Sequence, residues 1–197
     1  FYPSKNATTQ KYIQNDWAVE NGSNYRIYCL GVGEASNYTY VNNAYTANQV
    51  STLRDKLAEV DNSKPIFIIT HFPLHYTAQN YSSNSRTITR ASDVIDVLNT
   101  AANGGTPNDP SDDKKIVFIW GHNHSLNSPN DSHYDTIYQK GSSLQYDSSH
   151  SKEVEFFYVA AGSMSDSEKD AGSAKVEGKG LVATVKDNGL ISLTYHK

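Results

Sequence analysis

The sequence predicts a single domain of mixed α/β structure, and three observations support that prediction. Two short runs, 66–70 and 116–120, consist mainly of large apolar residues, which is typical of strands covered on both faces. A segment with apolar residues at helical spacing precedes each run, and this alternation indicates crossover connections within one sheet. Asn188-Gly189 separates two further strand-like runs and favours a hairpin turn, because both residues tolerate a positive φ angle. The chain has 197 residues, of which 37% are hydrophobic, and this is enough for one core.

The two expected helices are recognised by their periodicity and their ends. The first, 46–60, begins with Thr46 and Gln49 at capping-box spacing, and its apolar residues recur three and four positions apart. The second, 90–102, has the same period and ends before Asn103-Gly104-Gly105. The apolar stripes comprise Val50, Leu53 and Leu57 in the first helix, and Ala91, Val94, Ile95, Leu98 and Ala102 in the second.

The remaining expected strands are, in chain order, 25–30, 154–160, 181–185 and 190–194. Residues 1–24 and 125–152 have no clear periodicity and are expected to be mostly irregular. Gly31-Val32-Gly33 lacks the third glycine of a dinucleotide-binding loop and is interpreted as a turn.

Composition excludes several classes of protein. The formal net charge of −4 and the lack of a Lys/Arg run argue against a nucleic-acid or anionic-membrane partner. No stretch approaches the roughly 18 unbroken apolar residues of a membrane span. The single cysteine, Cys29, excludes an internal disulfide. A surface rich in Asn, Ser, Thr and Tyr is common on secreted bacterial proteins, so we expect an extracellular or cell-surface bacterial location.

Three of the seven histidines follow the buried strands. His71 comes directly after the first strand, and His122 and His124 follow the second after Gly121. Ligands collect at the carboxyl ends of strands in open α/β sheets, and alternate residues of an extended segment face the same way. We therefore expect the three imidazoles to share one metal site, with Gly121 permitting a sharp backbone turn without a Cβ clash.

The other histidines, His75, His133, His150 and His196, are expected to be ordinary structural or exposed residues. His75 keeps one alternative, because it lies four residues beyond His71. It is a candidate for contacting the phosphate or the leaving group of a substrate.

The histidine segments resemble two motifs of the calcineurin-like metallophosphoesterases, a superfamily that includes purple acid phosphatases. Ile68–Pro73 resembles the strand followed by His-x-Pro, and Gly121–His124 resembles the Gly-His-x-His block. The strand ending in Val159–Ser163 also fits the spacing of the family. The resemblance implies a four-layer sandwich of mixed sheets flanked by helices, of which this chain would be the C-terminal half.

The resemblance also implies the chemistry, which is hydrolysis of small phosphate esters by a metal-activated hydroxide. Two divalent or trivalent ions (Zn, Fe or Mn) would be held in the complete protein. His71 and His122 would bind one metal ion and His124 the other. The substrate within this class, the identity of the metals and the oligomeric state are not readable from the sequence.

Three further motifs of the family are missing upstream: Asp-x-His, the Gly-Asp block with the bridging carboxylate, and Gly-Asn-His with the catalytic histidine. Asp131-Ser132-His133 spells Asp-x-His in the wrong order and is interpreted as surface. We expect residues 1–197 to be one domain, the C-terminal portion of a metallophosphoesterase domain. Alone it would hold at most one metal ion, weakly, and be inactive.

Two alternatives remain open. Three histidines and a water would also suit a mononuclear zinc hydrolase. Tyr- and Asn-rich loops would suit a non-catalytic surface module that binds carbohydrate or protein. A serine hydrolase is not supported, because Gly-x-Ser-x-Gly is absent.

Overall fold

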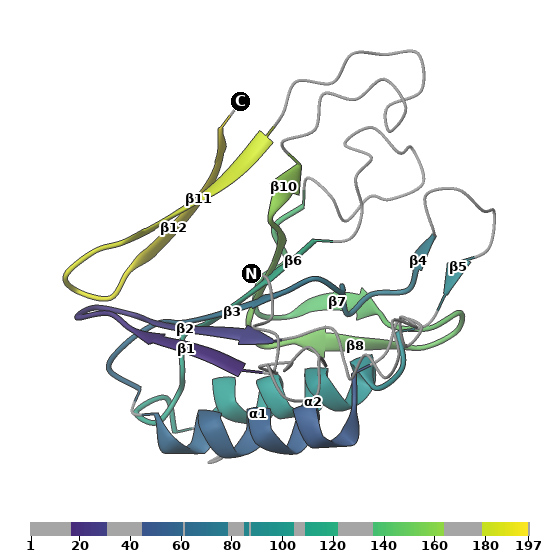
Figure 1. Cartoon of the computed structure of the whole chain (residues 1–197), viewed down its shortest axis with the longest axis horizontal. Helices are drawn as coiled ribbons and strands as arrows, with labels where there is room; N and C mark the ends of the chain where they lie inside the picture. Colours follow the sequence, from purple (N-terminus) through teal and green to yellow (C-terminus); the bar gives the residue numbers. More distant parts are fainter. Residues whose placement is uncertain are drawn as a thin grey trace, which may run out of the picture.

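The computed structural model describes residues 17–30, 45–60, 62–78, 85–86, 88–104, 109–121, 136–163 and 179–196. Figure 1 shows two helices beneath a twisted five-stranded sheet, with a long hairpin on the opposite side of that sheet. The described residues thus form a helix layer, a mixed sheet and a smaller antiparallel sheet, which confirms the predicted mixed α/β class.

The helices are α1 (Ala47–Glu59) and α2 (Ala91–Ala102). The strands are β1 (Trp17–Asn21), β2 (Arg26–Leu30), β3 (Ile66–Thr70), β4 (Thr77–Ala78), β5 (Ser85–Arg86), β6 (Ile116–Trp120), β7 (Ser142–Gln145), β8 (Ser151–Val154), β9 (Phe157–Ala160), β10 (Gly162–Ser163), β11 (Lys179–Val185) and β12 (Ile191–His196). None of the helices in the described part of the chain is both long and apolar enough to cross a membrane.

The main sheet has the strand order β1-β2-β3-β6-β9. Strands β2, β3, β6 and β9 are parallel to one another, while β1 pairs antiparallel with β2 at the edge. Helix α1 connects β2 to β3, and α2 lies between β3 and β6, so the predicted crossover connections are confirmed. Because β3 and β6 are parallel neighbours, their carboxyl ends lie together at one edge of the sheet.

The two helices cover one face of the sheet with the predicted stripes. Thr46 Oγ1 accepts a hydrogen bond from the Gln49 amide at 3.1 Å, and Gln49 Oε1 accepts one from the Thr46 amide at 2.8 Å, which completes the capping box. Helix α2 begins after Arg90, whose φ of 63° is left-handed, and is followed by Gly104 at φ 64°. The core on this face includes Val50, Leu53, Leu57, Val94, Ile95, Leu98, Ile66, Ile68, Ile116 and Phe118.

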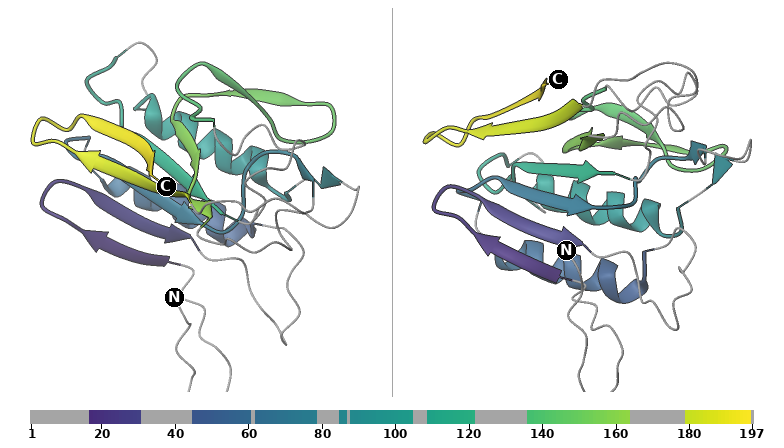
Figure 2. Two further views of the ribbon diagram at one scale, coloured as in Figure 1. Left: turned by 90° about the horizontal axis from the view of Figure 1, so that it is seen from above. Right: turned by 45° about the horizontal axis from the view of Figure 1, so that its top comes forward.

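The opposite face of the sheet is covered by the β11–β12 hairpin (Figure 2). Phe67, Val117 and Val159 point to this side and pack against apolar residues of the hairpin. The strands are therefore apolar on both faces because both faces are covered. Ile69 lies on the same face as Phe67 but is 38% exposed, so the hairpin covers the sheet less completely near the carboxyl end of β3.

Three segments differ from the sequence-based expectation. Residues 17–21, expected as irregular, form β1, because they pair with β2 rather than because of their own pattern. The segment 125–152 is expected to be mostly loop, but it contains β7 and the first half of β8. These strands pair as a hairpin with one buried residue each, Leu144 and Val154. One apolar residue per strand leaves no period-two signal.

The single strand expected over 154–160 is interrupted at residues 155–156. Val154 pairs with β7, whereas Phe157 begins the pairing with β6. The chain changes its pairing partner at this point. The sequence does not reveal such a change, because large apolar residues lie on both sides of Glu155.

Candidate metal centre

The carboxyl ends of β3 and β6 bring His71 beside Gly121. Thr70 and Trp120 are paired in the parallel register, and the next residues are His71 and Gly121. The Gly121 amide donates a hydrogen bond to the His71 carbonyl oxygen at 3.2 Å. The His71 side chain is exposed, and its Nδ1 lies 3.9 Å from the position that a Cβ on Gly121 would occupy. The structure therefore places one predicted ligand against the residue that precedes another.

His122 and His124 lie outside the described residues, as do Asp131 and His133. The predicted convergence of three imidazoles consequently stays a prediction. Within the described ranges, no three His, Cys, Asp or Glu side chains are grouped so that they could hold a metal ion. What the structure establishes is that the two strands carrying the motifs are adjacent, parallel and in register.

Among the described residues, the structure shows no Cβ clash that would explain Gly121. A Cβ at this position would meet the His71 carbonyl oxygen at 3.8 Å and Nδ1 at 3.9 Å, which are ordinary van der Waals contacts. Its φ angle is not in the left-handed region, unlike those of Gly104, Gly141 and Gly189. The residues that the structure describes therefore give neither a steric nor a conformational reason for glycine at this position.

The segment after His71 is attached to the core at several points. Phe72 and Leu74 are buried, and the Phe72 carbonyl accepts a hydrogen bond of 2.7 Å from the Tyr45 hydroxyl. Tyr45 is 1% exposed, and its burial raises the pKa of the phenol above its ordinary value. Further along, the Tyr76 amide donates to the Gln145 carbonyl of β7 at 2.8 Å.

His75 is fully buried, so of the two expected readings it is a structural histidine and not an exposed one. Its Nδ1 lies 2.6 Å from the Tyr158 hydroxyl, and its ring packs edge-on against Trp120 with centroids 4.7 Å apart. A ring without exposed surface does not present itself to a ligand at the surface. The geometry thus gives no support to direct contact between His75 and a phosphate group.

Sequence reasoning missed the two tyrosines that hold this segment, Tyr45 and Tyr158. Tyr45 lies next to a predicted helix and Tyr158 lies within a predicted strand. The hydroxyl partner of Tyr45 is 27 residues away, and the partners of Tyr158 are 83 and 84 residues away. The only sequence signal was a large phenol beside a run expected to be buried, where the hydroxyl requires a partner.

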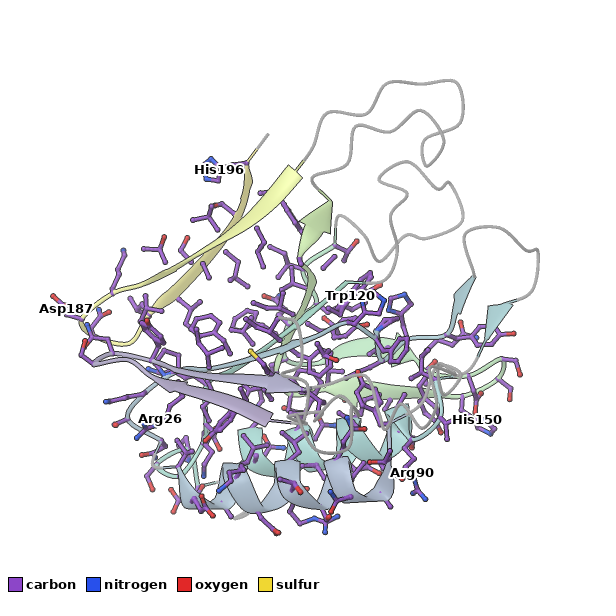
Figure 3. All side chains as sticks on the ribbon, in the orientation of Figure 1. Arg26, Arg90, Trp120, His150, Asp187 and His196 are labelled. Carbon is purple, nitrogen blue, oxygen red and sulfur yellow. The ribbon has the colours of Figure 1, made fainter. Side chains whose placement is uncertain are left out.

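The other described histidines are surface residues, as expected. His150 is exposed and its Nδ1 lies 2.8 Å from Asp147 Oδ2. The Asp147 pKa is lowered, chiefly by the Ser149 amide that donates to its carboxylate. His196 is exposed on β12. In Figure 3 both lie at the periphery, away from Trp120 at the carboxyl end of β6.

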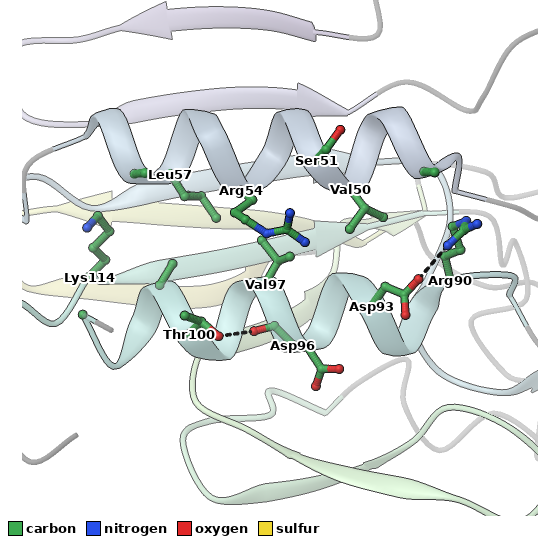
Figure 4. Close-up of a pocket in the computed structure, with 14 residues that line it drawn as sticks. Val50, Ser51, Arg54, Leu57, Arg90, Asp93, Asp96, Val97, Thr100 and Lys114 are labelled. Atoms are coloured by element: carbon green, nitrogen blue, oxygen red, sulfur yellow. Dashed lines mark hydrogen bonds and ion pairs between the residues drawn. The ribbon is translucent and has the colours of Figure 1, made fainter. Parts of the chain in front are cut away.

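Cys29, the single cysteine of the chain, lies half-buried in β2, in agreement with the predicted strand position. A separate groove of about 540 Å³ lies between α1 and α2 (Figure 4). It has an apolar floor that includes Val50 and Val97, and charges of both signs, with Arg90 and Asp93 paired at 3.0 Å. The groove is lined by the helices and the segments that flank them, so it is distinct from the strand ends that carry the histidines.

Comparison with known proteins gives no assignment. No protein-family model matches the chain, and a search of curated proteins finds no significant match.

Proposed function

We propose that the chain supplies His71, His122 and His124 to a binuclear metal centre that hydrolyses phosphate esters. The observation that carries the proposal is the parallel β3–β6 pair, whose register places His71 beside Gly121, the residue immediately before His122. The resemblance of the two histidine motifs to those of metallophosphoesterases supports the same reading.

The residue types fit metal binding. Imidazole is a ligand for zinc, iron and manganese, and the His71 side chain is exposed at the strand end. Metal ions bound there would lower the pKa of a coordinated water and stabilise charge on phosphoryl oxygens. The chain's own contribution is to orient the ligands: the Gly121 amide holds the His71 carbonyl, and Tyr45 holds the carbonyl of Phe72.

The donor set limits what the chain does alone. Two divalent ions roughly 4 Å apart repel by about 16 kcal/mol at an effective dielectric constant of about 20, and neutral imidazoles do not offset this. A bridging carboxylate does, and the two histidine motifs contain none. We therefore propose that the 197 residues hold one ion weakly, and that turnover requires carboxylate ligands beyond these motifs.

Calorimetric titration of the chain with Zn²⁺ or Mn²⁺ tests the ligand assignment. We expect one weak site, and at least tenfold weaker binding in His71→Ala, His122→Ala and His124→Ala. His150→Ala and His196→Ala are matched controls, since both histidines are exposed elsewhere. Equal affinity in all five variants would refute the assignment, and two tight sites would refute the one-ion expectation.

Hydrolysis of p-nitrophenyl phosphate and bis-p-nitrophenyl phosphate tests the reaction. We expect no turnover from the 197 residues alone. Metal-dependent turnover is expected from a protein that also carries the Asp-x-His, Gly-Asp and Gly-Asn-His motifs. Turnover by the chain with one bound ion would instead favour the mononuclear zinc hydrolase.

A further inference from the structure

A buried pair, His75 and Tyr158, joins the segment after His71 to strand β9. Both side chains have no exposed surface, and His75 Nδ1 lies 2.6 Å from the Tyr158 hydroxyl. The Leu74 amide donates to the same hydroxyl oxygen at 2.9 Å. Two consecutive residues of this segment are therefore attached to one phenol that comes from a different part of the chain.

The Tyr158 hydroxyl takes part in two hydrogen bonds with the segment after His71. The Leu74 amide can only donate, so the Tyr158 oxygen accepts from it. The same hydroxyl also forms the 2.6 Å hydrogen bond with His75 Nδ1, in which the tautomer of the imidazole sets which group donates. The buried phenol is therefore hydrogen-bonded to two neighbouring residues of this segment.

The same pair also touches the end of β6. The His75 ring packs edge-on against Trp120, with centroids 4.7 Å apart and planes at 70°. Trp120 in turn stacks on Tyr158, with centroids 5.7 Å apart and planes at 20°. Trp120 directly precedes Gly121 and His122. The pair is thus in contact with both chain segments that carry the candidate ligands.

We propose that His75 is a positioning residue which, through Tyr158, orients His71 and the end of β6 for metal binding. This inference rests on the proposed function of His71. His75 touches neither metal nor substrate in this role. If the segment is fixed, the His71 imidazole keeps one orientation, and metal binding does not have to restrict the backbone further. Loss of such supporting contacts weakens the affinity of metal sites about 10- to 100-fold.

Cobalt titration of the full chain, followed by visible absorption, tests the proposal with Co²⁺ alone as probe. We expect about tenfold weaker binding and altered absorption bands in His75→Phe and in Tyr158→Phe. The double variant should bind no more weakly than Tyr158→Phe, because each change removes the same interaction. His75→Asn should recover most of the affinity, since the Asn side-chain amide carries both an acceptor and a donor on Cγ and can replace the hydrogen bond to the Tyr158 hydroxyl.

Two further measurements separate positioning from loss of stability. Leu98→Ala removes a fully buried side chain of α2 and should lower the melting temperature without changing cobalt affinity. In the metal-free protein, hydrogen exchange at the Leu74 amide should accelerate in Tyr158→Phe and His75→Phe.

The outcomes distinguish this proposal from the function on which it rests. Wild-type cobalt binding that is unchanged in His75→Phe and Tyr158→Phe would overturn the positioning role and leave the metal centre intact. Absence of cobalt binding in the wild type, or binding unaffected by His71→Ala, would overturn the proposed function. Unchanged exchange at Leu74 would overturn the attachment itself.

Discussion

Removal of one hydroxyl at Tyr45 tests whether the segment after His71 is attached as the structure shows. Tyr45→Phe deletes the 2.7 Å hydrogen bond to the Phe72 carbonyl, and both residues are buried, at 1% and 5% exposure. A buried carbonyl left without its donor costs about 1–3 kcal/mol. We therefore expect the variant to lose about 2 kcal/mol of unfolding free energy at pH 7, because the ring and its packing are retained.

The stability difference between wild type and Tyr45→Phe should also depend on pH, and this dependence is a second, independent test. Burial raises the pKa of Tyr45 above its ordinary value of 10.0, so the folded state keeps the phenol proton at a pH where the unfolded state has lost it. The stabilisation that Tyr45 contributes to the folded state is fully present below pH 10. It is lost as the pH rises from 10 toward the pKa of Tyr45 in the folded protein. The loss approaches about 1.4 kcal/mol per pH unit. The advantage of the wild type over Tyr45→Phe should accordingly shrink above pH 10.

Urea unfolding followed by circular dichroism at pH 7, 9, 10 and 11 measures both effects. The difference between wild type and Tyr45→Phe isolates this group from the other tyrosines. Tyr146→Phe is the control, because this ring is only partly buried, and its stability should stay within about 0.5 kcal/mol of wild type at pH 7. A wild-type advantage below about 0.5 kcal/mol at pH 7, or one that stays constant through pH 11, would refute the reasoning.

Three further substitutions test local features of the fold by the same unfolding assay. Thr46→Ala removes the N-cap of α1 and should cost about 1 kcal/mol, whereas Thr46→Ser should be nearly neutral; equal losses would argue against the capping box. Gly104→Ala should cost about 2 kcal/mol or more, because its φ of 64° is left-handed and the added Cβ would collide with Asp112. Gly121→Ala should change stability by less than about 0.5 kcal/mol, and a larger loss would contradict the ordinary contacts found there.

The position of the candidate centre follows from the order of the strands. Strands β3 and β6 pair in parallel, with paired residues 50 positions apart in the sequence. This pairing brings the carboxyl ends of the two strands side by side. Tyr45, Leu74 and Tyr158 then restrict the segment that follows β3. An exposed imidazole on a well-anchored segment favours metal binding, because folding has already ordered the ligand.

The amino-acid sequence by itself determined the elements whose signals are local. The stripes and end residues of α1 and α2, the runs of β2, β3 and β6, and the Asn188-Gly189 hairpin were all predictable. Each depends on spacing over a few residues, which reflects helical or strand periodicity. The placement of His71 and Gly121 at adjacent strand ends was also predictable, because parallel crossover connections leave few alternatives.

Only the tertiary structure decided the features that depend on distant partners. Strand β1 forms because it pairs with β2. Strands β7 and β8 have little apolar pattern in their sequences, and each is stabilised by pairing with the other. The burial of His75 depends on Tyr158, 83 residues away, and on Trp120. Hydrogen bonds and packing between remote residues leave no periodic trace in a single sequence, since any polar side chain can pair with whatever the fold brings to it.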